Sequence, residues 1–228
     1  MGMRHGIPIM LGYLSVSFGF GVLCVQKNIS ILAAVGISVT NLTSAGQVAG
    51  VGVIAAGGSM LEMILCQLVI NLRYSLMSLS LSQKLAPSFT LPHRLVAGFG
   101  VTDEIFAVAS SQPEPIVPAY MYGLIFTPFI GWSLGTFLGA AAGDIMPKAL
   151  TAALSLMLYG MFIAIIIPPA KKSRRVLFVV LTAAGISILI HYLLPMISDG
   201  FSIIISALIA SIIAALIFPV QEKGEEES

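Results

Sequence analysis

Charged side chains are scarce in this sequence. Asp, Glu, Lys and Arg make up 9% of the 228 residues, whereas soluble domains carry about 25%. Hydrophobic residues make up 57%, so too few polar side chains remain to cover a soluble globule of this size. The net charge of +1 provides no field that would attract nucleic acid. These absences favour a protein that folds in a lipid bilayer.

Metal ligands and redox pairs are also few. Cys24 and Cys66 lie in apolar stretches, and the three His residues are scattered without ligand spacing. We therefore expect no disulfide, no metal site and no cofactor. The His-Glu-x-x-His motif of zinc proteases is absent. An aspartyl intramembrane protease would need a second membrane aspartate beside Asp103, but Asp144 and Asp199 fall at the ends of apolar runs. We predict no catalytic residues and do not expect an enzyme.

Long apolar runs fill most of the chain, and about 20 such residues cross a bilayer as one helix. The runs are 7–25, 31–58, 60–81, 119–143, 149–167, 176–194 and 201–218. Pro168, Pro169 and Pro195 are expected to end helices, because proline cannot continue one. We predict an all-α, polytopic transmembrane helical bundle with discontinuous or re-entrant helices. It forms a single domain over residues 1–220, with a motif-bearing part at 8–112 and an apolar helical part at 119–219. A short acidic cytoplasmic tail follows at 221–228.

Positive residues predict which loops lie in the cytoplasm. Lys171, Lys172, Arg174 and Arg175 form the strongest cluster, so their loop is expected on the cytoplasmic side. Counting back along the spans places the loops at 84–94 and 113–118 on the same side. The apolar segment 95–110 then starts and ends on one side, which favours a re-entrant or broken helix. From sequence alone, the run 31–58 either crosses once or folds back as two half-helices.

A helix start is predicted inside the run 31–58. Ser44-Ala45-Gly46-Gln47 matches the S-x-x-Q pattern of a capping box. A helix that restarts near Ser44 would present free N–H groups, which bind anionic substrate groups in transporters. The alternative is a kink at Gly46, with Asn41 and Gln47 bonded to neighbouring helices.

The span 60–81 carries a polar stripe and a buried cation. The stripe follows helical spacing and should face protein or water rather than lipid. Its members are Gln67, Asn71, Ser75, Ser78 and Ser82. Arg73 lies on another face, about 13 Å along the helix axis from Ser82. At that depth its guanidinium needs an acid or carbonyl oxygens.

Two acids in the segment 95–110 are the candidates to neutralise Arg73. They are Asp103 and Glu104. Thr102-Asp103-Glu104 is equally typical of a Thr N-cap followed by acids in the first helical turn. The depth of both acids within a short apolar segment favours the functional interpretation. We predict that one of them pairs with Arg73.

Small residues recur every four positions in two spans, which lets helix backbones approach closely in lipid. These stripes are Gly131, Gly135, Gly139 and Gly143, and Ser202, Ser206, Ala210 and Ala214. Internal packing is the preferred interpretation. The alternative is that one stripe docks a partner subunit.

Three short motifs carry a family resemblance, which covers residues 8–112. They are Ala45-Gly46-Gln47, Asn71-Leu72-Arg73-Tyr74, and Thr102-Asp103-Glu104 followed by the aromatic Phe106. Their order and separation resemble those of the AzlC family, the large subunit of bacterial branched-chain amino-acid exporters of the LIV-E type. Members of that family often carry proline and glycine after Gly-Tyr, whereas this chain has Leu14-Ser15 after Gly12-Tyr13.

The resemblance implies export of leucine, isoleucine, valine and methionine, driven by the proton gradient across the bacterial inner membrane. It also implies a small membrane partner of the AzlD type. Together with the predicted helix break and the polar stripe, it leads us to expect a substrate site and a charge network. The substrate-binding residues would be Ser44, Gly46, Gln47, Asn71, Ser75 and Phe106. Arg73, Asp103 and Glu104 would form the charge network, with the coupling proton on one of the two acids.

Three other functions stay open as alternatives. They are an amino-acid uptake permease, an ion-channel subunit and a non-transporting membrane scaffold. Channel filters usually come from rings of identical subunits, whereas broken helices around a buried charge set are typical of transporters. A scaffold would have no need for the polar stripe or the buried charges.

Overall fold

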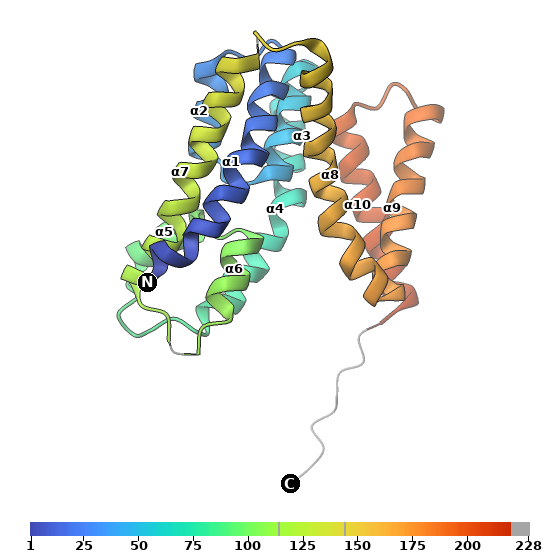
Figure 1. Cartoon of the computed structure of the whole chain (residues 1–228). Coiled ribbons are helices and arrows are strands. Elements are labelled where there is room, and N and C mark those ends of the chain that lie inside the picture. Colours follow the sequence, from blue (N-terminus) through green and yellow to red (C-terminus); the bar gives the residue numbers. More distant parts are fainter. Residues whose placement is uncertain (114, 144, 220–228) are drawn as a thin grey trace.

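Ten helices form the part of the chain that the computed structural model describes, which is residues 1–113, 115–143 and 145–219 (Figure 1). They are α1 (Gly2–Gln26), α2 (Ile31–Thr40), α3 (Ser44–Ala55), α4 (Met60–Ser82), α5 (Leu91–Phe99), α6 (Asp103–Ser110), α7 (Pro118–Gly143), α8 (Lys148–Lys172), α9 (Arg174–Leu193) and α10 (Asp199–Ile217). Within these ranges the only β-pairing is a single bridge between Leu85 and Ile116. The predicted acidic tail at 221–228 lies outside the described residues.

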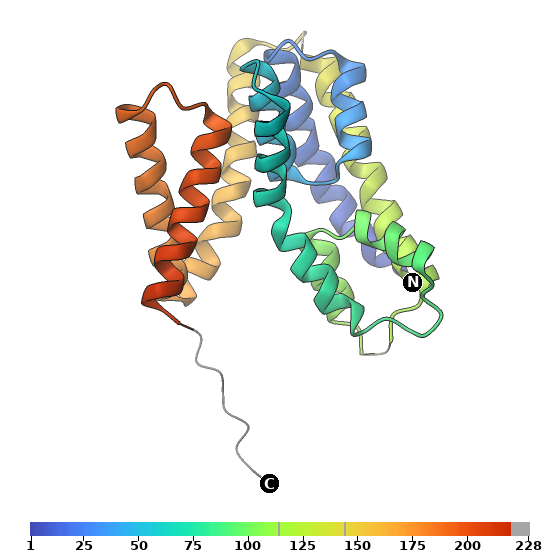
Figure 2. The ribbon, with the colours of Figure 1, turned by 180° about the vertical axis from the view of Figure 1, so that it is seen from behind.

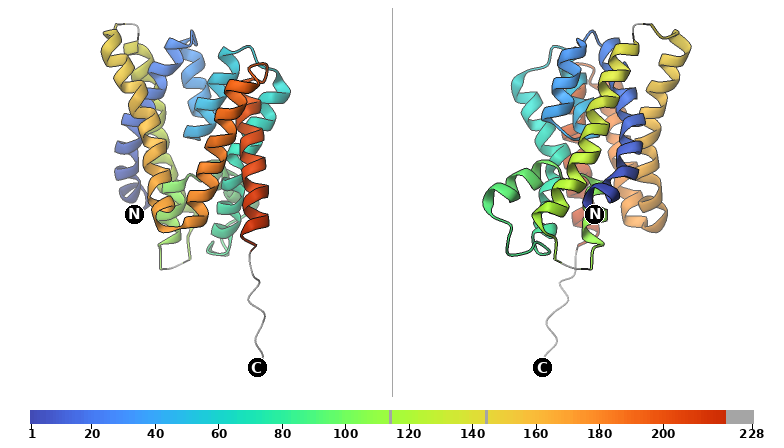
Figure 3. Two further views of the ribbon diagram at one scale, coloured as in Figure 1. Left: turned by 90° about the vertical axis from the view of Figure 1, so that its right-hand side faces the viewer. Right: turned by 60° about the vertical axis from the view of Figure 1, so that its left-hand side comes forward.

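Full-length spans and short helices are clearly separated. Five described helices, α1, α4, α7, α9 and α10, are long and apolar enough to cross a membrane. Helix α8 has 25 residues and packs against α1 and α9 (Figure 3). The other four helices have only 8 to 12 residues, which is too short to cross alone. The predicted polytopic helical bundle is confirmed.

The four short helices form two hairpins that enter the bundle from opposite ends. Helices α2 and α3 run from the upper end in Figure 1 to mid-height and back, while α5 and α6 do the same from the lower end (Figures 1 and 2). The run 31–58 therefore folds back as two half-helices. The predicted re-entrant element is also present, although its first half begins at Leu91 and its break falls at residues 100–102.

The two ends of the bundle differ in which loops they carry. The N-terminus, the loop 83–90 and the junction between α8 and α9 lie at the same end, and α10 also finishes there (Figures 1 and 3). This end includes the basic cluster at residues 171–175. The arrangement agrees with the predicted placement of these loops on one side of the membrane.

Helices α1 and α7 pack against each other along the glycine stripe of α7. A Cβ atom added to Gly135 would lie 2.1 Å from the Ser17 Oγ, and one added to Gly139 would lie 2.0 Å from the Phe18 carbonyl oxygen. Contacts this close require glycine. The glycine stripe is therefore an internal packing surface, which confirms the preferred interpretation of internal packing. It is not free to dock a partner.

A buried carboxylate joins the C-terminal helices to the rest of the bundle. Glu62, on the first turn of α4, is 4% exposed and accepts a hydrogen bond from the Ser198 hydroxyl, which caps α10. Gly58 and Gly200 leave space for it, because a Cβ at either position would lie within 2.7 Å of a Glu62 oxygen. The N-terminus of α10 favours a negative charge, so Glu62 holds α10 against α4.

One predicted helix end is wrong. Pro168 and Pro169 lie inside α8, which continues to Lys172. Proline removes its own N–H donor, but a transmembrane helix tolerates this where the freed carbonyl groups find other partners. The helix end predicted near Pro195 is confirmed, because α9 ends at Leu193.

The glycine packing between α1 and α7 makes a stability prediction. Gly139→Ala should lower the free energy of unfolding by about 1–3 kcal/mol, because the methyl group has no space against the Phe18 backbone. Gly185→Ala in α9 is the matched control, since no atom lies within 4 Å of its added Cβ. Unfolding of both variants in detergent, followed by circular dichroism, measures the difference. Equal stability of the two variants would contradict the packing account.

Candidate functional site

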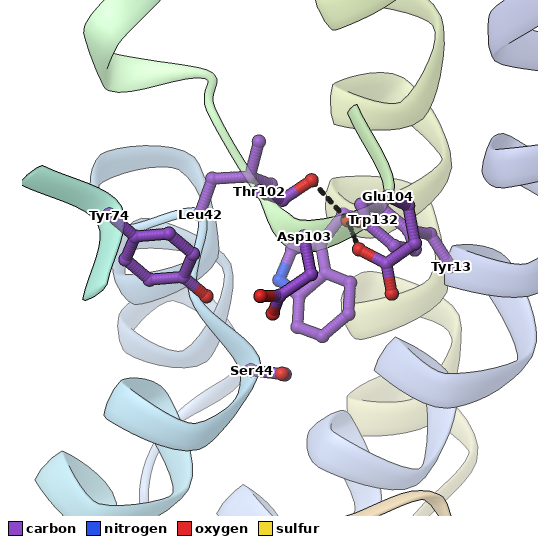
Figure 4. A pocket seen from close by; sticks show the side chains of 8 residues that line it. All are labelled: Tyr13, Leu42, Ser44, Tyr74, Thr102, Asp103, Glu104 and Trp132. Carbon is purple, nitrogen blue, oxygen red and sulfur yellow. Dashed lines mark hydrogen bonds between the residues drawn. The ribbon is translucent and has the colours of Figure 1, made fainter. Parts of the chain in front are cut away.

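The tips of the two hairpins line one cavity at mid-height in the bundle (Figure 4). Side chains from α1, α4 and α7 complete its wall. The lining residues are Tyr13, Leu42, Ser44, Tyr74, Thr102, Asp103, Glu104 and Trp132. Segments that are far apart in the sequence thus meet at the point where both hairpins turn.

The two hairpin tips are built alike. In each, a buried aliphatic residue precedes a threonine with extended backbone, and the threonine hydroxyl caps the helix that follows. Thr43 accepts a hydrogen bond from the Gly46 N–H, and Thr102 accepts one from the Ile105 N–H, both at 3.4 Å. The N-termini of α3 and α6 therefore both begin beside the cavity.

The predicted capping box at Ser44 is wrong by one residue. Thr43 is the N-cap, so Ser44 is the first helical residue of α3. The physical reason is that Thr43 takes the extended backbone (φ −142°, ψ 114°) and its hydroxyl bonds the Gly46 N–H. This places the Ser44 side chain in the cavity wall instead (Figure 4).

Arg73 is neutralised by one of the two predicted acids. Its Nη2 atom lies 3.0 Å from the Asp103 Oδ2 atom. The same nitrogen donates to the Tyr74 hydroxyl at 3.1 Å, and the guanidinium carbon lies 4.9 Å from the centre of the Tyr74 ring. The ion pair joins α4 to the first residue of α6, so it fixes the lower hairpin against a full span.

Glu104 has a different partner. The Tyr13 hydroxyl donates to the Glu104 Oε2 atom at 2.6 Å and lies 2.7 Å from the Thr102 Oγ1 atom (Figure 4). The Tyr13 and Trp132 rings pack in a T-shaped arrangement with 5.1 Å between ring centres. Among the described residues no Lys, Arg or His lies within ion-pair distance of Glu104. The two neighbouring acids are therefore distinct, since Asp103 binds a cation and Glu104 a phenol.

Gln47 supports the upper hairpin from within the protein. Its side chain is 1% exposed, and its Nε2 atom donates to the carbonyl oxygens of Ile37 and Asn41 at the end of α2. Its Oε1 atom accepts a hydrogen bond of 3.0 Å from the Trp132 Nε1 atom. The same two carbonyl groups also accept hydrogen bonds from the Asn41 and Thr43 N–H groups. Gln47 thus ties the end of α2 to α7, and it does not line the cavity.

A chain of hydrogen bonds braces the same hairpin against α4. The Thr43 hydroxyl donates to the Asn71 Oδ1 atom at 2.9 Å, and the Asn71 Nδ2 atom donates to the Gln67 Oε1 atom at 3.0 Å. The Gln67 Nε2 atom then donates to the Gly46 carbonyl oxygen at 2.8 Å. Part of the predicted polar stripe therefore bonds protein, as expected.

The structure brings together some of the predicted site residues and separates others. Of the six predicted substrate-binding residues, Ser44 lines the cavity, while Gly46, Gln47 and Asn71 lie in its supporting shell. Ser75 lies on the open side of α4. Phe106 packs against the hydrophobic cluster between α4, α5, α6 and α7.

Sequence reasoning missed five lining residues, which are Tyr13, Leu42, Tyr74, Thr102 and Trp132. Two signals were available in the sequence. Tyr74 adjoins Arg73, the cation of the span, and the single Trp lies in the glycine-striped span, where a buried indole N–H requires an acceptor. The position of Tyr13 gave no comparable signal.

The cavity is small in this conformation. Its volume is about 20 Å³, which is room for about one water molecule. A branched-chain amino acid does not fit into that space. Any such ligand therefore requires the hairpin tips to move apart.

Comparisons with known proteins agree with the motifs. The sequence model of the AzlC protein family matches residues 8–146. An uncharacterized membrane protein of Archaeoglobus fulgidus is 31% identical over 172 residues, which cover 75% of each chain. The inner membrane protein YgaZ of Escherichia coli is 26% identical over 180 residues, covering 76% of this chain and 74% of YgaZ. An uncharacterized membrane protein of Helicobacter pylori is 26% identical over 144 residues, covering 61% of this chain and 62% of that protein. No solved structure matches the chain.

The ion pair between Arg73 and Asp103 makes a testable prediction. Arg73→Gln and Asp103→Asn should each lower stability, because each leaves one charge unpaired at mid-membrane depth. The double variant should recover part of the loss. We expect a coupling energy of about 1 kcal/mol, in the low part of the usual range, because the side chains are 39% and 36% exposed. A double-mutant cycle of unfolding in detergent measures it, and strictly additive losses would contradict the pair.

Proposed function

The chain belongs to the AzlC family, and we propose that it is the large subunit of an exporter of branched-chain amino acids, coupled to protons. The substrates would be leucine, isoleucine, valine and methionine. One observation carries the proposal: two half-helix N-termini and two carboxylates, one of them paired with Arg73, meet at one cavity at mid-height. Transporters bind charged substrate groups at discontinuous helices of this kind.

The charges around the cavity nearly cancel when the substrate is absent. Asp103 and Glu104 contribute two negative charges, and Arg73 contributes one positive charge. The N-termini of α3 and α6 each add a partial charge of about +0.5. A zwitterionic amino acid is neutral overall, so it suits such a site only if each of its two charged groups finds its own partner.

We assign the two ends of the substrate to different partners. The carboxylate would bind at the N-terminus of α3, where Ser44 adds a hydroxyl group that faces the cavity. The ammonium would bind Glu104, because Asp103 already pairs with Arg73. Leu42 and Trp132 supply apolar wall for the aliphatic side chain.

Competition for Glu104 provides a simple coupling mechanism. A proton and a substrate ammonium each neutralise the same carboxylate, so binding of one favours release of the other. Tyr13 would orient the carboxylate through its hydrogen bond of 2.6 Å. If the site releases substrate on one side of the membrane and binds a proton there in its place, substrate and proton move in opposite directions, which is antiport.

The same proposal implies a membrane location for the chain and a partner subunit. We propose that the chain lies in the cytoplasmic membrane of a bacterial cell, with the basic end at residues 171–175 inside. A small AzlD-type membrane subunit would complete the exporter.

The experiment is leucine transport in liposomes that contain the chain and a co-expressed small subunit. Glu104→Gln removes the charge with little change of shape, so it should abolish proton-driven leucine transport and its pH dependence. Tyr13→Phe retains the carboxylate and should keep coupling with a shifted pH profile. Labelled leucine in inside-out and right-side-out vesicles reports the direction.

Three results would contradict this proposal. Proton-driven transport by Glu104→Gln with an unchanged pH profile would exclude Glu104 as the proton carrier. Leucine movement that never exceeds its gradient under an imposed proton gradient would favour a channel, and accumulation inside right-side-out vesicles would favour an uptake permease.

A further inference from the structure

A hollow of about 140 Å³ lies between the lower part of α4 and the first half of the lower hairpin. Figure 2 shows the lower half of α4, the loop 83–90 and α5 around this position. Its back wall consists of Leu81, Ala97 and Val101, which are buried in the hydrophobic cluster beneath the hairpin. The other lining residues are more exposed, and they are Ser78, Ser82, Leu85, Arg94 and Gly98.

The hollow opens away from the bundle. Its back wall is part of the hydrophobic core, so its mouth faces out of the protein, toward the lipid. Gly98 marks open space there, because a Cβ atom added to it would have no atom within 4 Å. The volume has room for roughly ten water-sized groups, which is enough for a small head group and the start of a hydrocarbon chain.

Arg94 is the cation of this hollow, and it differs from neighbouring cations in its contacts. Arg73 pairs with Asp103, and the Lys84 ammonium donates to two backbone carbonyl oxygens. Arg94 makes one hydrogen bond of 3.4 Å, from its Nε atom to the Phe89 carbonyl oxygen. Within the described ranges, no carboxylate lies at ion-pair distance from it. Its terminal nitrogens therefore remain available to an anion, which a guanidinium can bind through two parallel hydrogen bonds.

The chemistry of the lining selects among possible occupants. No acid lines the hollow, so a zwitterionic amino acid would leave its ammonium unpaired there. A transmembrane helix would need a groove of about 30 Å, whereas this one extends about 6 Å along α4, from Ser78 to Ser82, at 1.5 Å per residue. An anionic phospholipid carries a phosphate next to aliphatic chains, which matches one cation beside an apolar wall.

We propose that this hollow binds one anionic phospholipid from the leaflet at the basic end of the bundle. Arg94 would hold the phosphate, and an acyl chain would pack against Leu81, Ala97 and Val101. The position suits a head group, because Ser82 is the last residue of α4 and Arg94 lies in the first turn of α5. This inference goes beyond the proposed function and does not depend on the transported substrate.

The bound lipid would support the tip of the lower hairpin. Val101, in the back wall of the hollow, directly precedes Thr102, which lines the cavity. A lipid between α4 and α5 would therefore fill the space beneath that tip.

A photoactivatable lipid tests the site directly. The full chain is reconstituted in liposomes that contain phosphatidylglycerol with a diazirine in its acyl chain, irradiated, digested and mapped by mass spectrometry. We expect a lipid adduct within residues 78–101. Arg94→Gln should lower its yield at least fivefold, because it removes the phosphate ligand. Arg174→Gln should leave it unchanged, since it removes an exposed cation at the same end of the bundle, outside the hollow.

A second variant fills the hollow and leaves Arg94 in place. Gly98→Leu projects into open space, so it should fold and still lower the adduct yield at least fivefold. Gly185→Leu in α9 is the matched control, because no atom lies within 4 Å of its added Cβ either. It should leave the yield unchanged.

Four results would overturn the inference. They are the absence of an adduct within residues 78–101, an unchanged yield in Arg94→Gln, an unchanged yield in Gly98→Leu, and an equal yield from the matching phosphatidylcholine probe. The last result would mean that Arg94 extends to the membrane surface without selecting an anionic head group.

Discussion

A helix that begins inside a membrane leaves backbone N–H groups without partners, and the surrounding lipid cannot supply them. This chain meets that constraint twice, at Thr43 and Thr102, from opposite ends of the bundle. Each threonine caps its own helix, and the cavity between the tips receives the remaining positive potential. Acidic side chains on the first turn of α6 are stable there because two helix N-termini and Arg73 offset their charge.

The two tips are held by different sets of contacts. Gln47, Trp132 and Asn71 hold the upper hairpin against α7 and α4, whereas Tyr13 and Arg73 hold the lower hairpin against α1 and α4. Helix α4 takes part in both sets. A movement of α4, or of its neighbours, therefore bears on both tips and so on the opening of a cavity that otherwise holds about one water molecule.

Local patterns predicted much of this fold, while the roles of single side chains depended on tertiary contacts. Apolar runs and short motifs predicted the spans, the re-entrant segment 95–110 and the pairing of Arg73 with Asp103 or Glu104. They left open whether the run 31–58 crosses once or folds back. The structural role of Gln47 follows from Trp132, 85 residues away, and the contact of Tyr13 with Glu104 joins residues 91 apart. The first contact joins α3 to α7 and the second joins α1 to α6, so no local pattern of residues predicts either one.

The proposed antiport requires the cavity between the hairpin tips to open alternately to the two sides of the membrane. Ser44→Cys, in a chain whose two native cysteines are replaced by alanine, places one thiol in the cavity wall. Its labelling by a membrane-impermeant reagent is measured from each side, with and without leucine. We predict labelling from both sides, on separate samples, and protection by leucine in each case. Labelling from one side only, under all conditions of pH and substrate, would contradict the account.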